Sequence, residues 1–289
     1  MRFSKSEIRT RLEARVKKKE PILVGGAGLG LIGVVEEMAD VDMIMTCASD
    51  HYRMDGRPSA IAYYMFGSAN NITLNIISKR VNDRVKKTPL IAGITACDPY
   101  WNQERLLDEV ERLGYSGIIN APANYSHGEE MEIICRKTGY HMTFAADVDM
   151  IKRANDRGLF TIAYVFTKEQ AAAMAEAGAD IVCPHAGLTV WKLGPDPEDA
   201  RTLEDAIAFT GELTEAAKAA NRGVYVLCHG GPFNSPDKVQ KCFDETDVDG
   251  FIGTSAFDSQ PMYEAIVSSV KEYKKSREIY ASMRQEAEG

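Results

Sequence analysis

Two histidines follow neighbouring apolar runs of the sequence at matching points. His185 stands in Cys-Pro-His-Ala-Gly and His229 in Cys-His-Gly-Gly-Pro, each where a run of strand character ends. Side chains at the carboxyl ends of adjacent parallel strands converge, so the two imidazoles could serve as general acid and base or as metal ligands. We predict that both are catalytic. The alternative for each is a histidine that is hydrogen-bonded for structural reasons.

The segment 47–59 is the longest polar insertion, and it holds four residues that we predict to bind substrate: Ser49, Asp50, Arg53 and Arg57. Two arginines in one loop can clamp a carboxylate or a phosphate with paired N–H donors. The alternative is that these arginines pair with Asp50 and Asp55 on the surface. We expect the segment to be a lid or a substrate loop.

Polar residues and glycines follow the other apolar runs as well. Asp98 is the third predicted catalytic residue because it could orient water or a cation, although an aspartate in this position could equally cap the coming helix. Asn120 ends the next run and is predicted to bind substrate. Gly230, Gly231 and Ser255 come after the last two runs, where many barrels hold a phosphate on backbone amides. We predict an anion site there.

Gly28, Gly30 and Gly33 have the spacing of a dinucleotide-binding fingerprint, and they stand between a strand-like run and a helix. A doubly wound fold would then make Asp50 a candidate ribose ligand. We favour the other interpretation, in which the glycines allow a tight turn and close packing of the helix.

Strand-like and helical segments alternate through the whole chain, which is typical of a parallel sheet. The predicted strands span 22–24, 42–46, 89–94, 117–120, 160–165, 180–184, 224–228 and 250–253. Their nearly continuous apolar character indicates burial on both faces. Eight such units predict an α/β fold, a (β/α)8 TIM barrel, whose active site lies at the carboxyl ends of the strands. A helix over 4–19 and a polar, helical tail after Lys274 lie outside the repeat and either cap the barrel or contact another subunit.

The composition fits one globular domain over residues 1–289, with a barrel core of about 21–275. A net charge of -8 opposes general binding to nucleic acid or to an anionic membrane, and no apolar run is long enough to span a bilayer. The six cysteines are dispersed, which suits a reducing, cytoplasmic location. The extra terminal helices lead us to expect a homo-oligomer.

Several longer motifs carry a resemblance to a known family. They are Gly26-Ala-Gly-Leu-Gly30, Arg53-Met-Asp-Gly-Arg57-Pro-Ser59, Ala69-Asn70, Asp98-Pro99, Tyr164-Val-Phe166, Ala175-Glu-Ala-Gly-Ala-Asp180, His185-Ala-Gly-Leu-Thr189 and Leu227-Cys-His-Gly-Gly-Pro232. Over nearly its full length the sequence resembles the phosphoenolpyruvate hydrolase-like barrels, which are related by fold to the phosphoenolpyruvate mutase and isocitrate lyase group. In that group strand three ends in an Asp-x-Asp motif linked to Mg²⁺, whereas this chain has Thr95-Ala-Cys-Asp98.

The resemblance and the strand-end residues together predict a hydrolase or lyase for a small anionic oxo-acid or enol-phosphate. In this hypothesis the arginines hold the acid and His185 or His229 transfers protons. No cofactor is certain; a variant of the hypothesis has a divalent cation, Mg²⁺ or Zn²⁺, held by the two histidines with Asp98 or Asp258. The rival hypothesis is a barrel without turnover that binds a metabolite or a partner protein.

Overall fold

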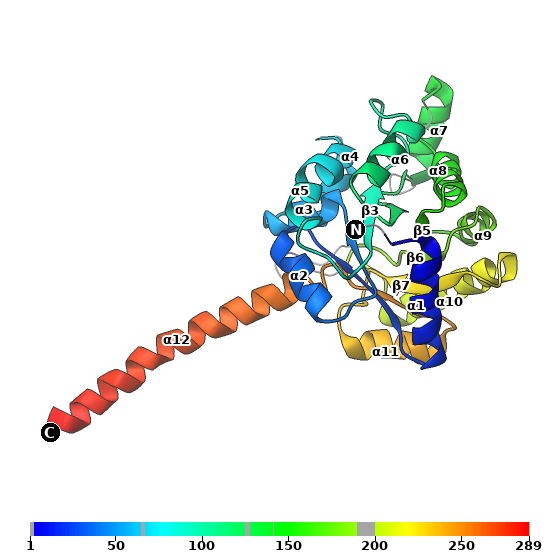
Figure 1. Ribbon diagram of the computed structural model, residues 1–289. Coiled ribbons are helices and arrows are strands. Elements are labelled where there is room, and N and C mark those ends of the chain that lie inside the picture. The colour runs from blue at the N-terminus through cyan, green and yellow to red at the C-terminus, as the bar shows by residue number, and fades with distance from the viewer. Residues whose placement is uncertain (1–2, 65–66, 125–127, 141, 190–199, 289) are drawn as a thin grey trace.

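Eight short strands, all parallel, close into a barrel in the computed structural model, which describes residues 3–64, 67–124, 128–140, 142–189 and 200–288 (Figure 1). The strands are β1 (Ile22–Gly26), β2 (Met43–Thr46), β3 (Leu90–Ile94), β4 (Gly117–Asn120), β5 (Phe160–Val165), β6 (Ile181–Pro184), β7 (Tyr225–His229) and β8 (Gly250–Ile252). Each strand pairs with its successor, and Ile22 to Val24 of β1 pair with β8 to close the ring. The predicted (β/α)8 barrel is confirmed.

The strands are buried on both faces because their residues alternate between two cores. Met43 and Met45 of β2 point into the barrel, where they join Phe160, Ile162 and other inward residues. Ile44, between them, packs outward against the surrounding helices. This alternation explains why the strands read as continuous apolar runs.

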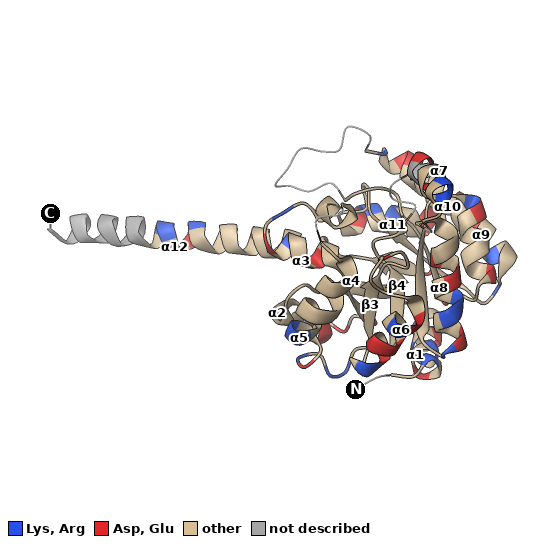
Figure 2. Cartoon of the chain, turned by 90° about the horizontal axis from the view of Figure 1, so that it is seen from above, with Lys and Arg blue, Asp and Glu red and all other residues tan. Residues whose placement is uncertain are grey.

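Helices cover the barrel on the outside and connect successive strands. They are α1 (Lys5–Lys17), α2 (Gly30–Met38), α3 (Ala48–Met54), η1 (Ser59–Tyr63), α4 (Ala69–Asn71), η2 (Ile72–Ile77), α5 (Ser78–Val81), α6 (Gln103–Arg112), α7 (Gly128–Thr138), α8 (Phe144–Asp156), α9 (Lys168–Glu176), α10 (Leu203–Ala220), α11 (Pro236–Glu245) and α12 (Ser259–Glu288). Acidic and basic segments alternate along outer helices such as α6 and α8 (Figure 2). Arg153 of α8 and Arg157, which directly follows α8, both pair with Glu104 of α6.

The N-terminal helix α1 closes the bottom of the barrel. Its Ile8 and Leu12 are buried with the inward residues of the strands. Arg9 donates to Asp180, which lies just before β6, at 2.8 Å, and Lys5 lies 2.9 Å from the same carboxylate. Of the two alternatives left open by the sequence, α1 therefore takes the capping role.

The segment 47–59 is not the loop that the sequence predicts. Residues 48–54 form α3, and the short helix η1 begins at Ser59. The carboxylate of Asp50 accepts the backbone N–H of Cys47 at 2.7 Å, which caps α3 in the manner of a helix start. Ser49 and Arg53 of this helix line the cavity described below, so the role of the segment as a lid or a substrate segment stays a prediction.

The C-terminal tail is helical beyond Lys274, as predicted. Helix α12 runs from Ser259 to Glu288 and projects away from the barrel as a long rod (Figure 1). Its first turn packs on the barrel through Met262. In the described part of the chain, none of the helices has the length and apolar character needed to span a membrane.

Candidate active site at the mouth of the barrel

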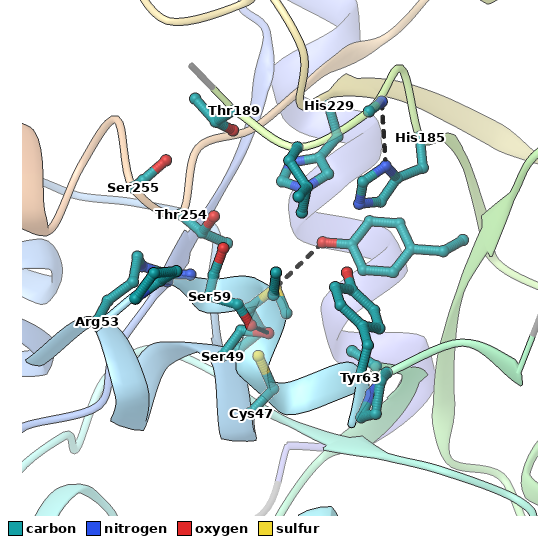
Figure 3. A pocket seen from close by; sticks show the side chains of 18 of the residues that line it. Cys47, Ser49, Arg53, Ser59, Tyr63, His185, Thr189, His229, Thr254 and Ser255 are labelled. Carbon is teal, nitrogen blue, oxygen red and sulfur yellow. Dashed lines mark hydrogen bonds between the residues drawn. The ribbon is translucent and has the colours of Figure 1, made fainter. Parts of the chain in front are cut away.

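A cavity of about 520 Å³ opens at the carboxyl ends of β2, β5, β6, β7 and β8. Figure 3 shows its interior, in which Arg53 lies across from His185 and His229. We call it the histidine pocket. Its described lining residues are Met45, Cys47, Ser49, Arg53, Gly56, Pro58, Ser59, Ala60, Tyr63, Ala121, Pro122, Tyr164, His185, Gly187, Leu188, Thr189, His229, Thr254 and Ser255.

The two histidines are in contact, as their matching strand positions predicted. Their residues form an isolated parallel bridge, and the ring centroids lie 4.9 Å apart in an edge-to-face arrangement. His185 Nδ1 accepts the backbone N–H of Gly187 at 3.2 Å. His229 Nδ1 lies 2.8 Å from the carbonyl oxygen of Ile252, to which it can only donate. These partners assign opposite tautomers: neutral His185 carries its proton on Nε2, and neutral His229 has a lone pair on Nε2.

Burial keeps both imidazoles uncharged. Burial and the neighbouring His229 lower the pKa of His185 to about 3. Burial also lowers the pKa of His229 to about 4, and the positive charge of Arg53 contributes. Near neutral pH the pair therefore offers one N–H donor and one lone-pair acceptor rather than two cations.

Two aromatic side chains pack against the histidine pair. The ring of Tyr164 stacks on His229 at a centroid distance of 5.0 Å and meets His185 edge-on at 5.1 Å, while the ring of Phe166 stacks on His185 at 5.3 Å. Asn120 accepts the backbone N–H of Tyr164 at 2.7 Å and donates to its carbonyl oxygen at 3.2 Å. Asn120, predicted to bind substrate, is fully buried and positions Tyr164 instead.

The charged side of the pocket is an ion cluster in which Arg53 bonds two buried carboxylates. Arg53 donates through Nε and Nη2 to Asp258 at 3.0 and 2.9 Å, and through Nη2 to Asp50. Asp50 and Asp258 are at most 1% exposed, and Arg53 is 7% exposed. The two carboxylates raise the pKa of Arg53 further above its ordinary value, so the guanidinium is charged. Asp50 therefore anchors Arg53 and lies outside the lining of the pocket.

One edge of the Arg53 guanidinium is left for a ligand. Among the described residues Nη1 donates to no protein acceptor, and Arg53 lines the histidine pocket. Arg57, the other half of the predicted clamp, is exposed and lies outside the lining of the pocket. The pocket thus has one arginine, held in a fixed orientation by its own carboxylates.

A third carboxyl lies near this cluster. Glu36 of α2 accepts the backbone N–H of Gly26 at 3.1 Å with Oε1, while Oε2 is buried without a hydrogen-bond partner. Burial, together with the negative charges of Asp258 and Asp50, raises the pKa of Glu36 to about 8. Glu36 is therefore protonated at neutral pH.

Asp98 does not meet the histidines. It lines a second cavity of about 490 Å³, beside the first, which shares only Tyr63 and Pro122 with it. Its carboxylate accepts Ser68 Oγ–H and the backbone N–H of Tyr100, and the cap of the following helix is Asn102. The predicted convergence of Asp98 with the histidine pair is thus wrong, and so is its alternative role as the helix cap.

The remaining predicted residues divide between the pocket and its supports. Ser49 and Ser255 line the histidine pocket. Gly230 and Gly231 have positive φ angles of 77° and 52°, and the N–H of Gly231 donates to Gly187 at 2.8 Å. The N–H of Gly231 is therefore used by Gly187 and is not available to the predicted anion. The two glycines form a turn after β7, and the hydrogen bond joins this turn to the segment that follows β6.

Several lining residues escaped prediction. Cys47, Ser59, Tyr63, Tyr164 and Thr254 line the histidine pocket. Tyr164 could have been found from the inward alternation of Phe160, Ile162 and Tyr164 along β5. No comparable pattern marks the others, which lie on helices or turns. The glycines of the fingerprint pack tightly, as expected: a Cβ at Gly28 would lie 2.4 Å from the Asp50 carbonyl oxygen.

The fold and the site define a (β/α)8 barrel with a ligand pocket at the carboxyl ends of its strands. Residues 7–276 match the model of the phosphoenolpyruvate hydrolase-like family, and the chain belongs to this family. It is 34% identical over 266 residues to the ToMV susceptible protein tm-1(GCR26) and to the ToMV resistance protein Tm-1(GCR237), both of Solanum lycopersicum. These matches cover 91% of this chain but 35% of each relative, so the chain spans about a third of their length.

Solved structures share the fold at low sequence identity. A phosphonopyruvate hydrolase in complex with oxalate and Mg²⁺ superposes with a TM-score of 0.59 at 18% identity, covering 95% of this chain and 87% of the other. An oxaloacetate acetylhydrolase gives a TM-score of 0.58 at 15% identity, covering 95% and 88%. Both likenesses establish the architecture.

Proposed function

We propose that this chain is a hydrolase or lyase that acts on a small anionic oxo-acid or enol-phosphate. The observation that carries the proposal is the histidine pair with opposite tautomers, which faces the free edge of Arg53 across one pocket. The family description and the substrates named for the two structural neighbours support the same class of substrate.

The groups of the pocket have separate roles in this proposal. Arg53 Nη1 binds a carboxylate or phosphate oxygen, which is a charge-assisted interaction. His229 Nε2 takes a proton from water or from the substrate, as a general base. His185 Nε2–H donates a hydrogen bond to the oxygen on which negative charge develops, as a neutral imidazole can do. Tyr164 keeps both rings in place through its stacking contacts.

A bound anion would also tune the base. The pKa of His229, about 4 in the empty pocket, makes it a weak base near neutral pH. A negative charge beside an imidazole favours its protonated form, so substrate binding raises this pKa toward the working pH. The acid limb of kcat/KM reports the free enzyme and is expected near pH 4, well below the 6.5 of an ordinary histidine.

A divalent cation does not fit the described donor set. Within the described part of the chain no group of three or more His, Cys, Asp or Glu side chains could hold a metal ion. The acids that would complete a site with the histidines are elsewhere, Asp98 in the second cavity and Asp258 on Arg53. We therefore propose that protein groups alone carry out the chemistry, and turnover that persists after EDTA treatment is the expected result.

Ligand binding tests the proposal first. We expect oxalate, pyruvate or phosphoenolpyruvate to raise the melting temperature by binding the native state. The shift should be lost in His185→Ala and kept in Arg57→Ala, a matched variant outside the pocket. Hydrolysis or cleavage of the binding acid is then measured directly. A shift that is lost in Arg57→Ala but kept in His185→Ala would refute this site.

A second candidate is a binding barrel without turnover. It is favoured by the names of the relatives, which describe susceptibility or resistance to a virus rather than a reaction. Both candidates predict binding to the histidine pocket, but only the first predicts product. Tight binding of an oxo-acid with no turnover across the panel would select the second.

We also propose a homo-oligomer in the cytoplasm. Tyr263, Ile266, Val270 and Tyr273 are exposed at spacings of three and four residues, which places them along one face of α12. Leu31, Val35 and Met38 form a similar exposed face on α2, which lies beside the base of α12 (Figures 1 and 2). A second copy can bury both faces symmetrically. The six cysteines form no disulfide among the described residues, which agrees with a reducing compartment.

Light scattering during size-exclusion chromatography tests the assembly. Val270→Asp should yield monomers, because it places a charge in the apolar face, while Ser268→Asp on the same helix should leave the assembly intact. A wild-type protein that is monomeric, or an assembly unaffected by Val270→Asp, would contradict the proposal.

A further inference from the structure

The second cavity, which we call the tyrosine pocket, has a lining unlike that of the histidine pocket. Tyr63, Tyr64, Tyr100 and Tyr140 line it, with Pro99, Pro122, Met142 and small residues between them. Asp98 is the only charged residue among its described lining residues. Its volume of about 490 Å³ lies within the range of small-molecule sites.

Within the described part of the chain, the carboxylate of Asp98 is buried without a cationic partner. It is 9% exposed, and among the described residues it forms no ion pair. One donor, Ser68 Oγ–H, binds Oδ2 and another, the backbone N–H of Tyr100, binds Oδ1. These two bonds fix the carboxylate and leave lone pairs on both oxygens. A largely buried carboxylate is normally paired, so the missing partner points to a ligand.

Aromatic rings and a fixed carboxylate are complementary to an organic ammonium group. The faces of tyrosine rings attract cations, and the carboxylate accepts N–H donors in charge-assisted bonds. Tyr100 is 86% exposed and Tyr140 38% exposed, which places aromatic surface where a ligand could cover it.

We propose that the tyrosine pocket is a binding site for an organic amine with an apolar or aromatic body, in which Asp98 binds the ammonium group. The site is separate from the histidine pocket, although Tyr63 and Pro122 contribute to both walls. The proposal does not depend on the reaction proposed above. An amine and an oxo-acid could therefore occupy the barrel mouth together.

Isothermal titration with three probes of similar body tests the site: 2-phenylethylamine, the neutral 2-phenylethanol and the anionic 3-phenylpropanoate. We expect the amine to bind at least about tenfold more tightly than the alcohol, since hydrogen bonds to charged groups are the stronger ones. The anion should not bind this cavity. Equal affinity for amine and alcohol, or no binding of the amine at millimolar concentration, would overturn the proposal.

Variants assign the preference to Asp98. Asp98→Asn should reduce the affinity for the amine to that for the alcohol, while Asp83→Asn, an exposed carboxylate elsewhere, should leave it unchanged. If Asp98→Asn fails to fold, Tyr100→Ala removes an exposed ring and should weaken amine binding several-fold. His229→Asn should preserve the amine preference; its loss there would place the amine in the histidine pocket and refute the assignment.

Discussion

The polar groups on the two sides of the histidine pocket differ in charge: one side is ionised and the other is neutral. On one side Arg53 is charged and bonded to Asp50 and Asp258. On the other side His185 and His229 are uncharged, and each uses Nδ1 for a backbone partner. Both sides come from strand ends and look alike in the sequence. Their difference shows that internal partners decide how much of a polar side chain a ligand can reach.

We expect the charged side to contribute mainly to the stability of the fold. Arg53→Met leaves two buried carboxylates without their cation, and breaking a buried ion pair in this way costs about 3–5 kcal/mol. We expect urea unfolding to show a loss of this size, with Arg53→Lys losing less because it keeps the charge. A loss below about 1 kcal/mol for Arg53→Met would mean that the cluster is hydrated, and the comparison would fail.

We expect the neutral side to contribute mainly to turnover. In His229→Asn the amide nitrogen can replace Nδ1 in the bond to Ile252, but the lone pair at Nε2 is lost. We expect turnover of the substrate found by the ligand screen to fall about 10²–10⁴-fold, the contribution of a positioned base. The free energy of unfolding should change little.

His185→Asn is the matched variant, since its amide oxygen can accept the Gly187 N–H. A hydrogen-bond donor to an oxyanion is lost, so turnover should fall in this variant as well. Stability losses as large as those of Arg53→Met, without a change in turnover, would show that the histidines are structural.

The barrel itself could be predicted because its signals are local and repeated. The start of helix α10 can be read from the sequence, since Thr202 caps the helix by accepting the N–H of Asp205 at 3.1 Å. The contact between His185 and His229 followed from the parallel register of β6 and β7. Both inferences need only strand order and a capping motif.

The ligand-binding surface could be predicted only in part. Asp50 and Arg53 are partners in one helix turn, but the second partner, Asp258, lies far along the chain. Asp98 and the histidines line two different cavities. Residues of η1, including Tyr63, contribute to the wall between these cavities. Strand-end position places a residue at the mouth of the barrel but does not say which cavity it enters.

Acid should destabilise the protein through the neutral side. In the unfolded chain the histidines bind protons below their ordinary pKa of 6.5, but in the folded chain only below about 3 and about 4. The unfolded state then binds more protons, so the free energy of unfolding falls as the pH decreases from 6.5 toward 4, by up to about 1.4 kcal/mol per pH unit for each histidine.

The difference between wild type and His229→Asn isolates this effect. Asp147 and Glu36 oppose it in the same interval, because burial raises their folded-state pKa values to about 7 and about 8. Both carboxyls are present in both proteins and cancel in the difference. Urea unfolding at several pH values should show a shallower acid loss in the variant. Parallel curves would mean that His229 is protonated in the folded protein.

Alkali should destabilise the protein through Glu36, which lies beside the charged side of the pocket. Glu36 has an ordinary pKa of 4.5 and a folded-state pKa of about 8. Between these values the folded state binds the extra proton, so the free energy of unfolding falls as the pH rises through this interval. Glu36→Gln removes the titration. Relative to its own value at pH 5, the variant should gain about 4 kcal/mol over wild type at pH 9, because wild type loses about 1.4 kcal/mol per pH unit between about pH 5 and about pH 8.

The exposed Glu176→Gln provides the control for the loss of one carboxylate, and it should follow wild type across the pH range. The result also fixes the charge of the cluster around Arg53. A neutral Glu36 leaves Arg53 with only Asp50 and Asp258 as charged neighbours, and binding of a substrate anion at Nη1 then adds repulsion from one net negative charge. If Glu36→Gln and wild type respond to pH alike, Glu36 is ionised at neutral pH. The cluster would then carry two net negative charges, which would oppose an anionic substrate more strongly and favour the binding barrel over the enzyme.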